Sequence, residues 1–113
     1  VGAVAQINNV YFVADASFLQ ISSYAELDKI VFFLQKNSNL KVEIGGHTNG
    51  LCDDHFCIKL STSRAKTCVD YLISKGVNPD RLIYKGYGKS QLIKPESPGD
   101  PLNQRVEIKI VGI

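Results

Sequence analysis

A polar loop and an arginine lie fifteen residues apart in this chain, and their side-chain types suit the binding of a small charged ligand. The loop covers residues 45–50 (GGHTNG), and Arg64 lies in the segment 60–65 (LSTSRA). Apolar and charged residues alternate over 40–44 (LKVEI), which predicts a half-buried strand just before the loop. In open α/β sheets, ligands bind beyond the carboxyl ends of strands, where loops lead into helices. We therefore expect a ligand site at this loop.

Periodicity and turn residues predict the elements that must position this loop. Ser22 or Ser23 is expected to cap a first helix, and Ser61 a second helix that ends at Gly76. Residues 78–80 form a predicted turn, and the segment 94–101 contains three prolines and is expected to be a loop. The predicted strands are 9–13, 41–45, 82–84 running into 86–88, and 106–110.

The predicted order of elements is βαβαββ. Two helices cover one face of a sheet well, so we expect an α+β fold, a two-layer sandwich with a mixed four-stranded sheet and both helices on one face. With 113 residues and 44% hydrophobic content, the chain is expected to form one domain over residues 1–113.

Composition argues against several classes of function. The net charge of +2 is small and the basic residues are dispersed, which disfavours nucleic-acid binding. The longest apolar run, residues 30–34, is too short to cross a bilayer, so we expect no membrane insertion by this domain. The residues at the start of the chain do not have the pattern of a secretion signal, which would lie outside this sequence.

Several motifs occur together in one order: GHTN at 46–49, LSxxRA at 60–65, KGV at 75–77, RL at 81–82, GYG at 86–88 and NQRVEI at 103–108. This set resembles the OmpA-like C-terminal domain, a peptidoglycan-binding module also found in Pal lipoproteins and flagellar-motor MotB proteins. The resemblance implies non-covalent binding of the diaminopimelate in the peptidoglycan stem peptide. It also implies a periplasmic module, without enzymatic activity or cofactor, that anchors an outer-membrane protein, lipoprotein or envelope complex for secretion or motility to the cell wall. Other envelope proteins would then be partners through regions outside this sequence.

The resemblance also implies which residues bind. The family usually has Asp where this chain has Asn49, and that Asp works with the arginine at the position of Arg64 to hold diaminopimelate. A guanidinium can meet a carboxylate with two parallel hydrogen bonds, and the Asn49 oxygen is expected to accept from the ammonium group. Backbone N–H groups around Asn49 and Leu51 are expected to add donors. The remaining residues that the resemblance places at the site are Asp15, Ala16, Thr48, Asn103 and Arg105.

The exchange of Asp for Asn49 leaves three interpretations open: weaker binding, a modified stem peptide, or a charge supplied by Asp15, Asp53 or Asp54. An alternative function follows, namely a protein-interaction scaffold of the same fold that has lost peptidoglycan binding. Some of these residues also have purely structural interpretations. Arg64 can pair with Asp70, Arg105 can pair with Glu107, and His47 can support the loop from below.

The three cysteines divide into a pair and a single residue. Cys68 lies on the apolar face of the second helix and is expected to be a buried free thiol. Cys52 and Cys57 flank residues 53–56 of the binding loop and are candidates for a disulfide in an oxidising periplasm, which would preorganise the site. The alternative is a zinc ion held by these two thiolates with His55 and His47. A Cys–His hydrolase is possible on composition, but no spacing in the chain demands it.

Overall fold

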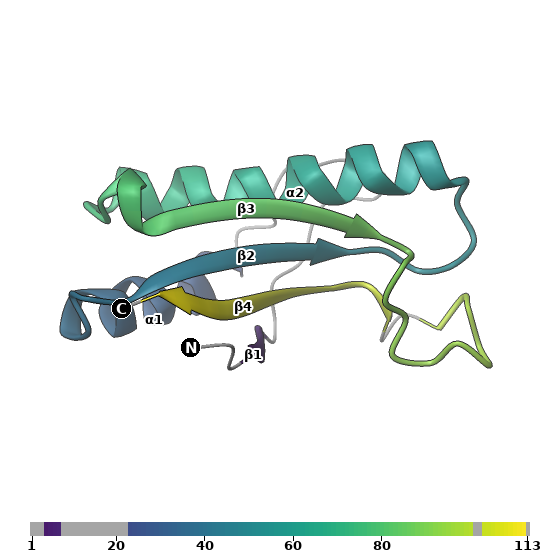
Figure 1. The fold of residues 1–113 in the computed structure, drawn as a ribbon, viewed down its shortest axis with the longest axis horizontal. Helices are drawn as coiled ribbons and strands as arrows, with labels where there is room; N and C mark the ends of the chain where they lie inside the picture. Colours follow the sequence, from purple (N-terminus) through teal and green to yellow (C-terminus); the bar gives the residue numbers. More distant parts are fainter. Residues whose placement is uncertain (1–3, 8–22, 101–102, 113) are drawn as a thin grey trace.

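The computed structural model describes residues 4–7, 23–100 and 103–112. Its elements are, in chain order, strand β1 (Val4–Ile7), helix α1 (Ser23–Lys36), strand β2 (Lys41–His47), helix α2 (Asp54–Ser74), the short 3-10 helix η1 (Pro79–Arg81), and strands β3 (Leu82–Gly88) and β4 (Arg105–Gly112). Strand β2 is connected to β3 through α2, so these strands run in the same direction, as Figure 1 shows. The chain thus has an α+β architecture with the predicted order of elements.

The sheet has the strand order β1-β4-β2-β3 and is mixed. Strand β2 pairs in parallel with β3 and antiparallel with β4, and β4 also pairs antiparallel with β1. Figure 1 shows α2 running along β3, with the carboxyl ends of β2 and β3 at the end where α2 begins. The loop after β2 therefore meets the loop after β3 at one end of the sheet.

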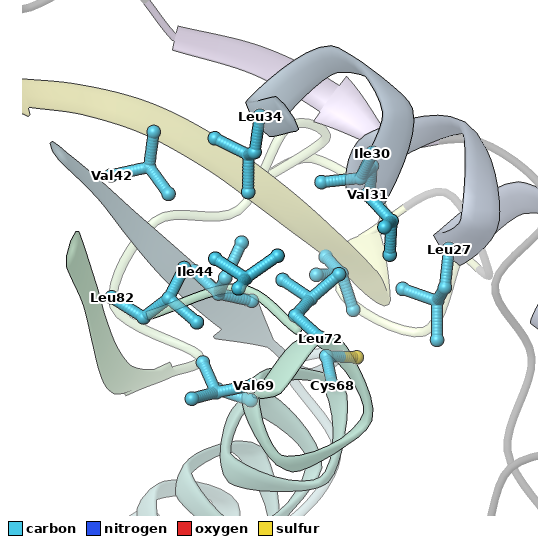
Figure 2. Close-up of a cluster of buried hydrophobic side chains, with 13 residues drawn as sticks. Leu27, Ile30, Val31, Leu34, Val42, Ile44, Cys68, Val69, Leu72 and Leu82 are labelled. Atoms are coloured by element: carbon cyan, nitrogen blue, oxygen red, sulfur yellow. The ribbon is translucent and has the colours of Figure 1, made fainter. Parts of the chain in front are cut away.

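The two helices bury their apolar residues against one face of the sheet. Alternation places Val42 and Ile44 of β2 on the helix side, and both are fully buried. In Figure 2 the labelled side chains of α1 and α2 converge over these strand residues. The cluster consists of Leu27, Ile30, Val31, Leu34, Val42, Ile44, Ala65, Cys68, Val69, Leu72, Val77, Leu82 and Val106.

Two predicted boundaries need correction or qualification. The second helix begins at Asp54 rather than after Ser61, and its cap is Asp53, whose carboxylate accepts the N–H of Phe56 at 3.0 Å. Ser61 lies inside the helix. The predicted strand at 9–13 lies outside the described residues. The first strand that the structure describes is β1 at Val4–Ile7.

The RL motif at residues 81–82 has a structural explanation in Arg81. Its guanidinium donates to the backbone oxygens of Leu34 (2.8 Å), Asn37 (2.8 Å) and Leu40 (3.0 Å). The last carbonyl groups of a helix lack partners within the helix, and a basic side chain satisfies them here. Arg81 thereby ties the end of α1 to the start of β2.

Candidate functional site

Two glycines let α2 approach the sheet closely near the site. A Cβ atom on Gly46 would lie 2.3 Å from the backbone oxygen of Ser61, and one on Gly86 would lie 2.3 Å from the backbone nitrogen of Thr62. Ser61 also accepts the backbone N–H of Gly88 through its hydroxyl oxygen at 2.9 Å. These contacts fix the middle of α2 on the ends of β2 and β3. They explain why a small polar residue, Ser61, lies at this position of the LSxxRA segment.

Arg64 lies on the buried side of α2, with 8% of its surface exposed. Cys57, Ser61 and Arg64 follow one another at intervals of four and three residues, so they share one stripe of the helix. Side chains on a helix lean toward its N-terminus, which for Arg64 is the direction of Cys57 and the loop after β2. Asp70, the predicted structural partner of Arg64, pairs instead with Lys66 at 3.0 Å.

The loop after β2 is fixed by its own hydrogen bonds. Thr48 donates its backbone N–H to the oxygen of Gly88 (2.9 Å), and Gly50 donates its N–H to the oxygen of Pro98 (2.7 Å). Between them, the side-chain oxygen Oδ1 of Asn49 accepts the N–H of Leu51 at 3.0 Å. The Leu51 N–H is thus used within the loop, and its donation to a ligand stays a prediction.

A disulfide between Cys52 and Cys57 spans the start of α2, with the two Cα atoms 5.8 Å apart. Both sulfur atoms lie against the backbone oxygen of Asn49, at 3.8 Å from Cys52 and 3.9 Å from Cys57. The disulfide thus joins the loop to the first turn of the helix directly beneath Asn49. This is the pairing that the sequence analysis expected.

The disulfide also bears on the zinc and hydrolase alternatives. Cys52 and Cys57 have no thiolate to offer a metal or a substrate while they are bonded to each other. Within the described ranges, no group of three or more His, Cys, Asp or Glu side chains is arranged to hold a metal ion. The remaining thiol, Cys68, is buried in the core, and burial raises its pKa to about 12. Cys68 is therefore a core residue rather than a nucleophile.

Asn103 organises the loop that follows β3. Its side chain is fully buried, and its Oδ1 accepts the N–H of Lys94 at 2.8 Å. Its Nδ2 donates to the oxygens of Ser97 (3.0 Å) and Pro98 (3.2 Å). Since Pro98 in turn accepts the N–H of Gly50, Asn103 supports the Asn49 loop through this second loop. A direct contact between Asn103 and a ligand stays a prediction.

Arg105 is held by three acceptors. Its Nε donates to Glu107 at 2.7 Å, and its two Nη groups donate to the oxygens of Asn103 (3.0 Å) and Gln91 (2.8 Å). Its side chain is 5% exposed. Arg105 lies opposite His47 in the β2–β4 register, on the face of the sheet away from the contact between Gly46 and α2. The described contacts do not bring it to Arg64.

His47 is the centre of a polar cluster on that second face. Its ring stacks on Tyr87 with centroids 4.9 Å apart, and its Nε2 lies 3.3 Å from Glu107, although neither ring nitrogen has a hydrogen-bond partner among the described residues. Burial and the nearby Arg105 charge lower the pKa of His47 to about 4. The ring is therefore neutral near pH 7.

Tyr87 and Glu43 belong to the same cluster and were missed from sequence. Tyr87 donates its hydroxyl to Glu43, and this bond raises the pKa of Tyr87 to about 12. With His47, Gln91, Glu107 and Lys109, they surround a shallow hollow over Gly45 of about 90 Å³. The alternation of strand β2 was the available signal, because it places residues 43, 45 and 47 on the same face of the sheet.

Among the predicted site residues, the structure thus brings together Thr48, Asn49, Leu51 and the disulfide at the start of α2, with Arg64 farther along the same helix stripe. Asp15 and Ala16 lie outside the described residues.

The chain has relatives among known proteins. The family model of the OmpA family matches residues 11–105. The chain belongs to the OmpA family. Domains of this family bind ligands and are not enzymes, in agreement with the prediction from sequence.

Curated relatives of this OmpA-family chain come from several lineages. It is 34% identical to the photosystem I P700 chlorophyll a apoprotein A2 of Gloeobacter violaceus, over 90% of this chain and 13% of that protein. It is 31% identical to outer membrane porin F of Pseudomonas fluorescens, over 90% of this chain and 32% of the porin. It is 30% identical to the peptidoglycan-binding protein ArfA of Mycobacterium bovis, over 89% of this chain and 32% of ArfA. The chain thus spans a third or less of the length of these relatives.

A solved structure shares the fold. The OmpA-like domain of FopA1 from Francisella tularensis superposes with a TM-score of 0.78 at 24% identity, covering 99% of this chain and 84% of that domain. Neither helix in the described part of the OmpA-family chain is long and apolar enough to cross a membrane.

Proposed function

We propose that this domain binds peptidoglycan through the diaminopimelate of the stem peptide and so holds an envelope protein to the cell wall. The observation that carries the proposal is the placement of Arg64: a buried guanidinium on the helix stripe that meets the Asn49 loop at Cys57. A carboxylate-bearing ligand offers a partner that matches the guanidinium with two parallel hydrogen bonds.

The relatives support the same chemistry. ArfA is named for peptidoglycan binding and porin F for the outer membrane. A domain that spans a third of such proteins suits an attached wall-binding module, and the periplasm is the compartment where the Cys52–Cys57 disulfide is stable. The alternative function, suggested by Asn49 in place of the usual Asp of the family, is a protein-interaction scaffold that has lost its ligand.

Sedimentation with purified sacculi tests the proposal. Wild-type protein is expected to sediment with the sacculi, and Arg64→Ala to remain in the supernatant with at least a tenfold loss of affinity. Lys66→Ala is the matched control, because this substitution removes the same charge from the exposed side of the same helix. Equal sedimentation of Arg64→Ala and wild type would contradict the role of Arg64. Absence of wild-type sedimentation would favour the scaffold function.

A further inference from the structure

The hydrogen bond between Asn49 and Leu51 determines which way the carboxamide faces. Oδ1 accepts the N–H of Leu51 at 3.0 Å. Only the oxygen of a carboxamide can accept a hydrogen bond, so the NH₂ group occupies the other position. An aspartate here would make the same bond with one oxygen and present its second oxygen as an acceptor. Asn49 therefore presents a donor where the aspartate presents an acceptor.

The surroundings of Asn49 oppose the reverse orientation. The backbone on either side is held by the bonds of Thr48 to Gly88 and of Gly50 to Pro98, and the disulfide sulfurs lie within 3.9 Å of the backbone oxygen of Asn49. Turning the carboxamide over would place its NH₂ against the N–H of Leu51, leaving two donors face to face. Turning it over therefore forfeits this hydrogen bond, which at an exposed position contributes on the order of 1 kcal/mol.

The two carboxylates in the described part of this loop lie at the start of α2, one used as its cap and the other exposed beside a lysine. Asp53 caps α2 by accepting the N–H of Phe56. Asp54 has a side chain that is 88% exposed and lies 3.6 Å from the ammonium of Lys89, which also donates to the backbone oxygen of Cys52 at 2.7 Å. The polar group that Asn49 itself turns outward is therefore a donor, which suits an acceptor better than an ammonium group.

Peptidoglycan contains diaminopimelate in two chemical forms at its side-chain amine. In an uncross-linked stem the amine is a free ammonium with three donors. In the acceptor stem of a cross-link it is acylated, so the charge is gone and a carbonyl oxygen, an acceptor, stands beside the nitrogen. The neighbouring carboxylate is unchanged in both forms and remains available to Arg64.

We propose that this domain prefers diaminopimelate whose side-chain amine is acylated, as in cross-linked peptidoglycan, over diaminopimelate with a free ammonium group. This inference rests on the function proposed above. The NH₂ group of Asn49 donates to the acyl carbonyl while Arg64 pairs with the carboxylate. A free ammonium would instead face the NH₂ donor of Asn49 without a charged acceptor.

Calorimetric titration with a matched pair of ligands tests this preference. The ligands are a disaccharide tetrapeptide with the free amine and the same molecule acetylated at that amine. Wild-type protein is expected to bind the acetylated ligand at least threefold more tightly. Asn49→Asp restores an outward acceptor with a negative charge, so it is expected to reverse the preference and favour the free amine at least tenfold. Asn39→Asp is the charge-matched control; Asn39 is exposed at the opposite end of β2 and should leave the wild-type preference unchanged.

The outcomes separate the inference from the function on which it rests. Equal binding of the two ligands, or tighter binding of the free amine by wild type, would overturn the preference and leave the proposed function intact. Failure of wild-type protein to bind either ligand would overturn both. Arg64→Ala is expected to weaken binding of both ligands alike. A melting curve of Asn49→Asp that matches wild type would show that the variant has kept its fold.

Discussion

At the residue scale, the proposed function gives Arg64 and Asn49 complementary tasks that depend on the geometry of their polar groups. The Arg64 guanidinium offers a rigid planar fork, whereas a lysine at this position would offer a point charge. The Asn49 carboxamide has one end fixed by Leu51 and one end available. Substitutions that keep charge but change geometry are therefore informative.

Arg64→Lys keeps the positive charge and removes the fork. We expect muropeptide affinity to fall about tenfold, because one of two parallel hydrogen bonds to the carboxylate is lost. The melting temperature of the variant provides the control for packing. Affinity equal to that of wild type, measured by calorimetry, would show that charge alone suffices.

His47 predicts a dependence of stability on pH. Its folded pKa of about 4 lies below the value of 6.5 that the residue has when unperturbed, so between these values the unfolded state binds more protons than the folded state. Stability therefore falls as the pH drops from about 6.5 to 4, by on the order of 3 kcal/mol. The charged groups facing the ring are Arg105 and Glu107 on β4 and Glu43 on β2, and Tyr87 of β3 stacks on it.

Urea unfolding at pH 7 and pH 4.5 measures this effect. His47→Gln is expected to lose less stability over this range than wild type, whatever its stability at pH 7. His55→Gln, at an exposed histidine, should retain the wild-type difference. Parallel losses in wild type and His47→Gln would contradict the assignment to His47.

At the element scale, the contact between α2 and the sheet positions the site. Ser61 bonds to Gly88, and Gly46 and Gly86 leave room for the helix backbone. Any side chain added at these glycines must push α2 away from the strands, and Arg64 moves with it.

Gly46→Ala is expected to destabilise the domain by about 1–3 kcal/mol, because its methyl group would lie 2.3 Å from a backbone oxygen that cannot rotate away. Chemical denaturation measures the change. Gly112→Ala is the control, since a Cβ there would meet only the Lys41 side chain, at 3.5 Å or more. Similar midpoints for the two variants would show that α2 is not closely fixed at Gly46.

The elements also show what sequence can and cannot predict in this chain. Both helices and the strands at 41–47 and 105–112 follow clear periodicity, and those were predicted within a few residues. The start of α2 was not, because Asp53 and Ser61 are both good caps and residues 54–60 have mixed polarity. The use of Asn103 and Arg105 within the protein depends on where loop carbonyls such as those of Pro98 and Gln91 point, which no local pattern encodes. The bond from Leu51 to the Asn49 side chain, in contrast, is a local Asx turn.

At the scale of the whole molecule, the site lies at one end of the sheet, where the loop after β2, the loop after β3 and the start of α2 meet. Gly50 bonds to Pro98, and the Cys52–Cys57 disulfide joins the first loop to the helix. The site is thus supported from several sides before any ligand arrives, which reduces the entropy lost on binding.

A thiol titration of the unfolded, unreduced protein tests the disulfide. One free thiol, that of Cys68, is expected, and reduction should raise the count to three. The Cys52→Ser, Cys57→Ser double variant is expected to lose about 2 kcal/mol of stability, since the bond closes a short loop, and to bind muropeptide more weakly. Three thiols before reduction would contradict the disulfide.

The central claim is that a diaminopimelate carboxylate meets Arg64 beside the Asn49 loop, and NMR titration of labelled protein with a muropeptide tests it most directly. The account predicts that the Arg64 side-chain resonance and the backbone amides of residues 48–52 shift together and saturate at one ligand per domain. Shifts confined to the exposed surface of α1 around Phe32 and Phe33, with Arg64 unchanged, would contradict it.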